Sequence, residues 1–180
     1  METIALFGGS FDPPHVGHIA VIEALKEFSI IDKIIVMPTF LNPFKTQSFA
    51  SAELRLAWLR EIFRGENRVI IDDYEVKQAK KIPSIQSVEY LLKSYKKVYL
   101  IVGADSLDSL HKWHKFDVLK DKVTFIITTR DTIMIPENYL RLDVQEDISS
   151  TQLRENIDIS KLPKTCAQEI AQFYKENNAN

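Results

Sequence analysis

Short apolar runs alternate with helical patterns along this 180-residue chain, and no other feature constrains the fold as strongly. The runs are continuously apolar, which is typical of parallel strands that are covered on both faces. They lie at residues 4–7, 33–37, 68–72, 98–102 and 123–128, with a weaker sixth run at residues 139–144. The chain is therefore predicted to form one α/β domain, residues 1–180, built on a doubly wound parallel sheet of five to six strands.

Helical patterns separate and follow these runs, at residues 16–28, 52–63, 84–95, 104–110, 112–119, 150–156 and 165–175. In doubly wound sheets, ligands bind beyond the carboxyl ends of the strands. The segments that directly follow predicted strands should consequently meet at one edge of the sheet, and they are residues 8–18, 38–45, 103–113 and 148–154.

The first of these segments has the residues of an anion site. Gly8 and Gly9 end a strand, and His15 and His18 open the next helix. Backbone N–H groups in a Gly-rich turn and the positive end of a helix attract anions, and imidazoles three residues apart share one helix face. This arrangement suits a triphosphate. A zinc pair is the alternative for the two histidines, but no third ligand is evident. Asp12 precedes them and could cap the helix.

The last segment, residues 148–154, contains a second set of phosphate-binding groups. Ser149 is predicted to cap a helix, with Gln152 completing a capping box. Arg154 lies one turn in from Ser150. Hydroxyl groups, free N–H groups and a guanidinium group can together hold a phosphate.

Composition and charge exclude several classes of function. The formal net charge is −2, so the chain lacks the basic footprint of a nucleic-acid-binding protein. Apolar stretches are shorter than the roughly 20 residues that span a bilayer, and the first residues have no signal-peptide pattern. Cys166 is the single cysteine, which excludes an intrachain disulfide. A cytoplasmic protein without nucleic-acid or membrane partners is expected.

The phosphate-binding motifs of two common nucleotide-binding classes are missing. No G-x-G-x-x-G follows a predicted strand, and no acidic residue ends the strand at residues 33–37, which argues against a redox enzyme with a dinucleotide-binding fold. No Gly-Lys-Ser/Thr follows the two glycines, so the turn is not a Walker A loop. The predicted phosphate site must therefore differ from both the G-x-G-x-x-G turn and the Walker A loop.

Two motifs resemble those of the nucleotidylyltransferase superfamily. Residues 15–18, His-Val-Gly-His, match its (H/T)-x-G-H signature, and residues 148–154 match the I-S-S-T-x-(I/V/L)-R motif that holds ATP phosphates in its adenylyltransferases. Class I aminoacyl-tRNA synthetases share the first motif but pair it with a Lys-rich motif that is absent here. The resemblance implies a Rossmann-like nucleotidylyltransferase fold in which His15, His18 and Arg154 are catalytic.

A third stretch resembles one branch of the superfamily, the nicotinate-nucleotide adenylyltransferases. Residues 103–107, Gly-Ala-Asp-Ser-Leu, are followed by Trp113, as in the G-x-D-S-L…W segment of that family. By this resemblance Asp105 lies near the ATP ribose, and Trp113 stacks on the pyridine ring of the mononucleotide. Lys45 ends a P-x-x-x-x-P-x-K loop and would contact the mononucleotide phosphate, while His114 could supply a polar contact to the ring.

The chain departs from this family at residues 83–88, Pro-Ser-Ile-Gln-Ser-Val. Many members have P-S-Y-T-x-x-T there, with a threonine that helps recognise the nicotinate carboxylate. Ile85 and Gln86 replace the tyrosine and threonine, so Ser87 or backbone N–H groups would have to take over this contact. The choice between an acid and an amide pyridine stays open at this point.

The resemblance implies transfer of the adenylyl group of ATP to nicotinate mononucleotide, giving nicotinate adenine dinucleotide and pyrophosphate. The mononucleotide phosphate is already anionic, so no general base is needed, and Mg²⁺ would be carried by the ATP phosphates rather than by protein ligands. The residues implied to bind ATP are Gly8, Gly9, Ser10, Phe11, His15, His18, Gly103, Asp105, Ile148, Ser149, Ser150, Thr151 and Arg154. Those implied to bind the mononucleotide are Lys45, Ile85, Gln86, Ser87, Trp113 and His114.

Several alternatives stay open on sequence alone. Nicotinamide mononucleotide or phosphopantetheine could be the acceptor, a cytidylyltransferase is more distant, and a non-catalytic nucleotide-binding module is the rival from another class. The sequence also leaves the oligomeric state open, with a homo-oligomer as one option. Phe40, Phe44 and Phe49 could form a lid or an association surface.

Overall fold

The computed structural model describes residues 1–130, 132–146 and 148–178, and these contain one six-stranded sheet of order β3-β2-β1-β4-β5-β6. Every neighbouring pair of strands is parallel, which confirms the predicted fold class. The strands are β1 (Thr3–Gly9), β2 (Lys33–Pro38), β3 (Val69–Ile71), β4 (Lys97–Gly103), β5 (Val123–Thr128) and β6 (Leu140–Leu142).

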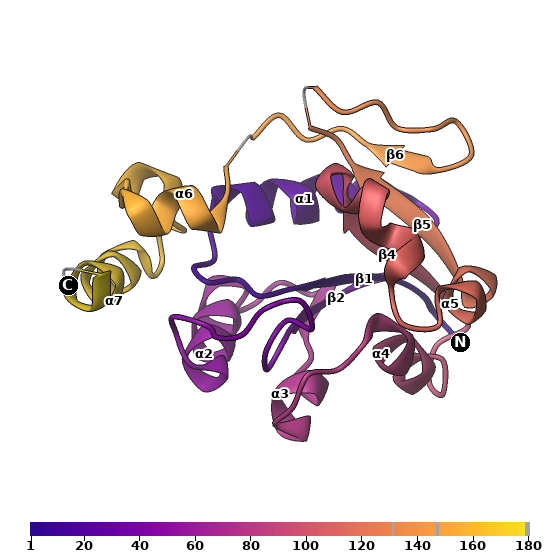
Figure 1. Cartoon of the computed structure of the whole chain (residues 1–180), viewed down its shortest axis with the longest axis horizontal. Coiled ribbons are helices and arrows are strands. Elements are labelled where there is room, and N and C mark those ends of the chain that lie inside the picture. The colour runs from indigo at the N-terminus through magenta and orange to yellow at the C-terminus, as the bar shows by residue number, and fades with distance from the viewer. Residues whose placement is uncertain (131, 147, 179–180) are drawn as a thin grey trace.

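Both faces of the sheet are buried, as the continuous apolar runs predicted. Along β1 the side chains of Ile4 and Leu6 enter one core, and that of Ala5 enters the other, because successive residues of a strand point to opposite faces. The first core is covered by α4 (Ser84–Leu91) and α5 (Phe116–Lys122), and the second by α1 (Val16–Lys26). Figure 1 shows α1 and α4 on opposite faces.

The order of the strands indicates where the binding crevice of the sheet lies. The chain moves outward in one direction from β1 to β3, then returns to the centre and moves outward in the other direction from β4 to β6. The connections after β1 and β4 therefore leave on opposite sides, and a crevice opens between the carboxyl ends of these two strands. Gly8 and Gly9 end β1, and Gly103 ends β4.

A third core ties the C-terminal helices to α2 (Ala52–Ile62). Trp58 of α2 packs with Ile170 and Tyr174 of α7 (Ala167–Asn178) and with Leu153 of α6 (Ser150–Glu155). The indole Nε1 of Trp58 donates a hydrogen bond to the carboxylate of Glu169, at 3.0 Å. The sequence after β6 is thereby held at the same edge of the sheet as the turn after β1.

Some element boundaries differ from the predicted ones. The helix predicted at residues 84–95 ends at Leu91, and the two helices predicted at residues 104–110 and 112–119 are a 3₁₀ helix, η1 (Ala104–Lys112), and α5. Two short helices were not predicted, α3 (Tyr74–Gln78) and the 3₁₀ turn η2 (Ile159–Lys161). They are too short for an apolar period to appear. None of the described helices has the length and apolar character needed to cross a membrane.

Candidate active site

The four segments predicted to converge do line two adjoining cavities at the carboxyl edge of the sheet. The cavities have volumes of about 430 and 420 Å³. We call them the tryptophan cavity, which Trp113 lines, and the histidine cavity, which His15 and His18 line. Asn42, Ile101 and Ser106 line both, so the two spaces meet there.

Most residues predicted to bind ATP lie around the histidine cavity. They are Ser10, Phe11, His15, His18, Gly103, Asp105, Ile148, Ser149, Ser150 and Thr151. Gly8 and Gly9 line the tryptophan cavity instead, because they end β1, which runs beneath both spaces. Arg154 lines neither cavity, and its guanidinium group donates to the carbonyl of Asp12, in the turn that leads to the two histidines. Asp105 is paired with Arg130, which also lines the histidine cavity, at 3.3 Å between Oδ1 and Nε.

The two histidines stack on each other at the start of α1. His15 is the N-cap residue and His18 lies in the first turn, with ring centroids 3.6 Å apart and an interplanar angle of 22°. The backbone N–H of His15 donates to His18 Nδ1 at 3.1 Å. A neutral imidazole carries a proton on only one nitrogen, so this bond assigns the His18 proton to Nε2.

Both imidazoles are uncharged at neutral pH. Burial, together with the positive charge of Arg130, lowers the pKa of His15 to about 4. Burial and the neighbouring His15 lower the pKa of His18 well below its usual range. His18 is therefore a neutral hydrogen-bond donor through Nε2, and it needs no extra proton to bind a phosphate oxygen. Bound phosphates would raise both pKa values, because nearby negative charge favours the imidazolium form.

Gly17 makes this stacking possible. A Cβ atom at position 17 would lie 2.9 Å from two atoms of the His15 ring, closer than real Cβ contacts. His15 is buried and cannot easily move away. The glycine of the His-x-Gly-His signature is thus required by the packing of the first histidine rather than by an unusual backbone angle.

Gly17→Ala should therefore disturb both stability and catalysis. We expect a loss of about 1–3 kcal/mol in the free energy of unfolding, typical of overpacking, and a fall of about tenfold or more in kcat, because His15 and His18 shift together. Denaturant unfolding and steady-state kinetics check the two effects. Gly103→Ala is the stability control, since its Cβ would meet Thr128 at an ordinary 3.8 Å. Wild-type values for Gly17→Ala would contradict this account of the signature.

Asp12 does not cap the histidine helix, contrary to the sequence prediction. Its carboxylate accepts hydrogen bonds from the backbone N–H groups of Phe49 and Ala50, at 2.8 and 3.0 Å, and from the hydroxyl of Tyr174. It thereby joins the turn after β1 to the loop after β2 and to α7. Burial and the charge of Asp12 raise the pKa of the Tyr174 hydroxyl, which remains a donor.

Arg55 of α2 is a second organising residue, and the sequence analysis missed it. Its guanidinium group is fully buried and donates to the carbonyl oxygens of Ser10, Thr39, Phe40 and Ala50, at 2.7, 2.8, 3.0 and 3.1 Å. The turn after β1 and the loop after β2 are therefore fixed by one side chain. On sequence, Arg55 reads as a polar position of an amphipathic helix, and only the tertiary contacts show its role.

Contacts with the Asp12–Pro13 corner bring α6 to the site. Arg154 Nη1 donates to the Asp12 carbonyl at 2.6 Å, and Ser150 Oγ donates to the Pro13 carbonyl at 2.9 Å. The Arg154 guanidinium also lies 4.6 Å from the ring centroid of Phe49. Ser149 caps α6 by accepting from the backbone N–H of Gln152, as predicted. These hydrogen bonds hold the motif at residues 148–154 against the turn that leads into the His-x-Gly-His signature.

Lys45 lines the histidine cavity rather than the tryptophan cavity. Partial burial and the positive charge of Arg154 lower its pKa. It follows Asn42 in the same loop, at the boundary of the two spaces, so it can reach a phosphate of either ligand.

The phenylalanines of this loop differ in their surroundings. Phe44 is exposed and lines the tryptophan cavity, while Phe40 packs beside Leu56.

The tryptophan cavity contains only part of the predicted mononucleotide site. Trp113 and His114 line it, as expected, but Ile85, Gln86 and Ser87 do not. Ile85 packs in the hydrophobic core, and Ser87 is buried with its hydroxyl bonded to Glu75. The residues just before them line the cavity instead, namely Ile82, Pro83 and Ser84.

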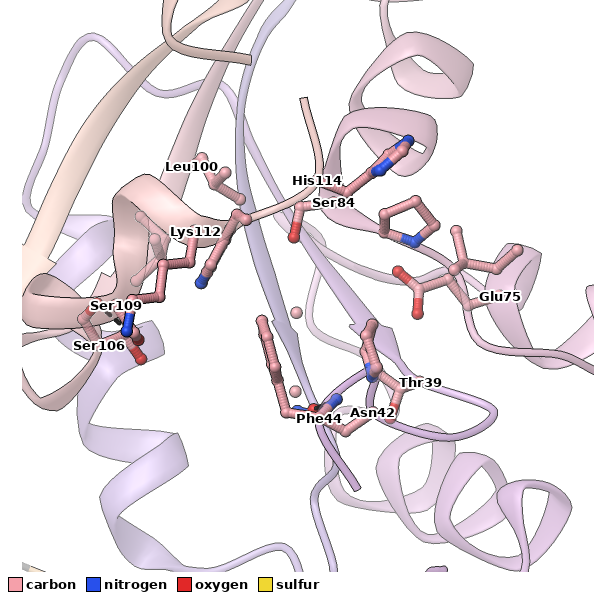
Figure 2. Close-up of a pocket in the computed structure, with 17 residues that line it drawn as sticks. Thr39, Asn42, Phe44, Glu75, Ser84, Leu100, Ser106, Ser109, Lys112 and His114 are labelled. Carbon is pink, nitrogen blue, oxygen red and sulfur yellow. Dashed lines mark hydrogen bonds between the residues drawn. The ribbon is translucent and has the colours of Figure 1, made fainter. Parts of the chain in front are cut away.

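Glu75 is the residue of this cavity that sequence reasoning missed. It lies in α3, the short helix that no periodic pattern indicated. Figure 2 shows Glu75 on one side of the cavity, with Ser106 and Ser109 on the other.

Among the described residues, no group of three or more histidine, cysteine or acidic side chains could hold a metal ion.

The fold and this pair of cavities define a nucleotidylyltransferase, and the family model described as cytidylyltransferase-like matches residues 6–156. Over nearly full length on both sides, the chain is similar to proteins named probable nicotinate-nucleotide adenylyltransferase. One from Sulfurimonas denitrificans is 61% identical over 99% of this chain and 98% of its own length, and one from Nitratiruptor is 49% identical over 96% and 98%. The chain belongs to the nicotinate-nucleotide adenylyltransferase family.

Solved structures agree on the fold. The nicotinic acid mononucleotide adenylyltransferase of Plasmodium falciparum, complexed with NaAD, has a TM-score of 0.78 to this chain at 19% identity. The match covers 100% of this chain and 99% of that one. A putative nicotinate-nucleotide adenylyltransferase from Vibrio parahaemolyticus has a TM-score of 0.70 at 20% identity, covering 94% and 99%.

Proposed function

We infer that this chain transfers the adenylyl group of ATP to nicotinate mononucleotide, with nicotinate adenine dinucleotide and pyrophosphate as products. The observation that carries this inference is the pair of adjoining cavities in a member of this family. One is lined by two stacked histidines and hydroxyl groups, and the other by Trp113. A triphosphate suits the first and a flat pyridine ring suits the second.

The two ligands would meet where the cavities meet. ATP in the histidine cavity and the mononucleotide in the tryptophan cavity would bring the α-phosphate and the 5′-phosphate together near Asn42 and Ser106. Lys45, next to this boundary, can offset the repulsion between the two anionic groups. Holding the two reactants at this distance converts a bimolecular step into an effectively unimolecular one.

The 5′-phosphate then attacks the α-phosphorus in line, and pyrophosphate leaves. The nucleophile is already ionised, so the protein's contribution is positioning and stabilisation of charge. His18 donates from Nε2 to a phosphate oxygen, His15 supports its ring, and Arg154 supplies positive charge beside the leaving group. We propose that ATP enters as its Mg²⁺ complex, with the ion held mainly by phosphate oxygens.

Trp113→Ala should raise the KM for the mononucleotide by about 10- to 100-fold, because an aromatic stacking contact contributes about 1–3 kcal/mol. The KM for ATP should change less than twofold. Steady-state kinetics with each substrate varied in turn gives both values. Trp113→Phe is the matched control, since it keeps a stacking surface and should restore most of the affinity. A larger effect on the ATP KM would mean that the two cavities have been assigned to the wrong substrates.

The function itself is tested by pyrophosphate release from Mg²⁺-ATP. Nicotinate mononucleotide, nicotinamide mononucleotide and phosphopantetheine are offered separately, and each product is identified by mass. Fastest turnover with the nicotinate form supports the proposal. Preference for the amide form or for phosphopantetheine would assign a different acceptor, and no turnover with any of them would favour a binding module.

A cytoplasmic location and self-association into a homo-oligomer remain predictions from the sequence. Size-exclusion chromatography with light scattering tests the second. If the protein is a monomer at micromolar concentration, the exposed Phe44 belongs to a binding loop and not to a subunit interface.

A further inference from the structure

Glu75 lines the tryptophan cavity and has one buried carboxyl oxygen without a hydrogen-bond partner among the described residues. Its side chain is only 6% exposed. Oε1 accepts a hydrogen bond from Ser87 Oγ at 2.6 Å, whereas Oε2 is buried without a hydrogen-bond partner among the described residues. The carboxyl group points into the cavity (Figure 2). A buried polar atom without a partner costs about 1–3 kcal/mol, so a bound ligand is the natural partner for Oε2.

The surroundings of Glu75 favour its neutral form. Burial raises its pKa to about 7, the hydroxyl of Ser87 on α4 opposes this, and the negative charge of Asp72 adds to it. Lys112, on the side opposite Glu75, and His114 line the same cavity (Figure 2). A neutral carboxyl group donates one hydrogen bond, while an ionised one only accepts. The carboxyl oxygen Oε2 can therefore be a donor at or below neutral pH.

We propose that Glu75 is a specificity-determining residue: protonated Oε2 donates a hydrogen bond to the pyridine carboxylate of nicotinate mononucleotide. The ionised side chain repels that carboxylate and accepts instead from the N–H group of a carboxamide. This proposal rests on the proposed function, because it requires the mononucleotide in the tryptophan cavity. It also replaces the recognition role that the sequence analysis gave to Ile85, Gln86 and Ser87, which do not line the cavity.

Binding of the acid ligand must then be coupled to a proton. A carboxylate placed beside Glu75 raises its pKa further, so binding above pH 7 takes up a proton, and at pH 8 the uptake should be close to one proton per molecule. The KM for nicotinate mononucleotide should rise above pH 7 by up to tenfold per pH unit. Nicotinamide mononucleotide carries the same 5′-phosphate but no carboxylate, so neither effect is expected with it.

The test is titration calorimetry at pH 8 in buffers of different ionisation enthalpy, with each mononucleotide and the wild-type protein. The same titrations with Glu75→Gln should show no carboxylate-linked proton uptake, because the glutamine amide donates at any pH. Its KM for the nicotinate form should be independent of pH. Glu89→Gln, on the exposed face of α4, is the matched control and should behave as wild type.

The outcomes separate this proposal from the function on which it rests. Turnover of nicotinate mononucleotide with equal proton uptake in wild type and Glu75→Gln, or with a KM that does not change between pH 7 and 9, would overturn the role of Glu75 alone. Absence of turnover with both mononucleotides would overturn the proposed function and this role together. The wild-type titrations decide the matter even where Glu75→Gln folds poorly.

Discussion

His18→Ala is expected to lower kcat by about 100- to 1,000-fold, with little change in the KM for either substrate, because it removes one donor to the charge that develops on phosphate. The donor is Nε2, since Nδ1 already accepts from the backbone N–H of His15. An interaction that strengthens only in the transition state affects turnover and not ground-state binding.

Single-turnover and steady-state kinetics measure this loss. His111→Ala is the control, because His111 is exposed and lines neither cavity. A fall of less than about tenfold would argue against a transition-state role for His18. Since His18 is neutral in the free protein, kcat/KM for ATP, which reports the free enzyme, should not follow an imidazole titration between pH 6 and 8.

Arg55→Met is expected to lower the free energy of unfolding by about 3–5 kcal/mol, the largest change in stability proposed for this chain. Four backbone carbonyl oxygens would lose their donor, and the buried carboxylate of Asp12 would lose a neighbouring positive charge. Methionine fits the space but cannot donate a hydrogen bond.

Urea or guanidinium unfolding followed by circular dichroism gives the value. Arg60→Met, one and a half turns further along α2, is the matched control. Its guanidinium group is half-exposed and paired with Asp73, so the loss there should be below about 1 kcal/mol. Similar values for the two variants would mean that the Arg55 contacts do not hold the loops after β1 and β2 together.

The sheet could be predicted from the sequence because both of its faces are buried. Runs such as residues 33–37 and 98–102 have no polar alternation, and this pattern excludes a half-exposed strand. The convergence of four loops then followed from the rule for ligand sites in such sheets. The sequence predicted that His15 and His18 share one face of a helix, but not that their rings stack. Only the structure shows that Gly17 lies so close to the His15 ring that a Cβ atom would not fit.

The residues that sequence reasoning missed act through contacts distant in the chain. Asp12 bonds Tyr174, and Arg55 bonds the carbonyl group of Ser10, at separations that no local pattern encodes. Glu75 lies in a helix of five residues, too short to give a periodic signal. The motif-based assignment of Ile85 and Ser87 was wrong about where they lie, because α4 begins at Ser84 and turns both side chains toward the core.

We expect the histidine cavity to hold ATP and the tryptophan cavity to hold the mononucleotide, with their phosphates joining between them. A crystal structure with nicotinate adenine dinucleotide tests this most directly. The adenylyl phosphate should lie within hydrogen-bond distance of His18 Nε2, with the pyridine ring stacked on Trp113. A dinucleotide bound in the opposite direction, or with its pyridine outside the tryptophan cavity, would contradict it.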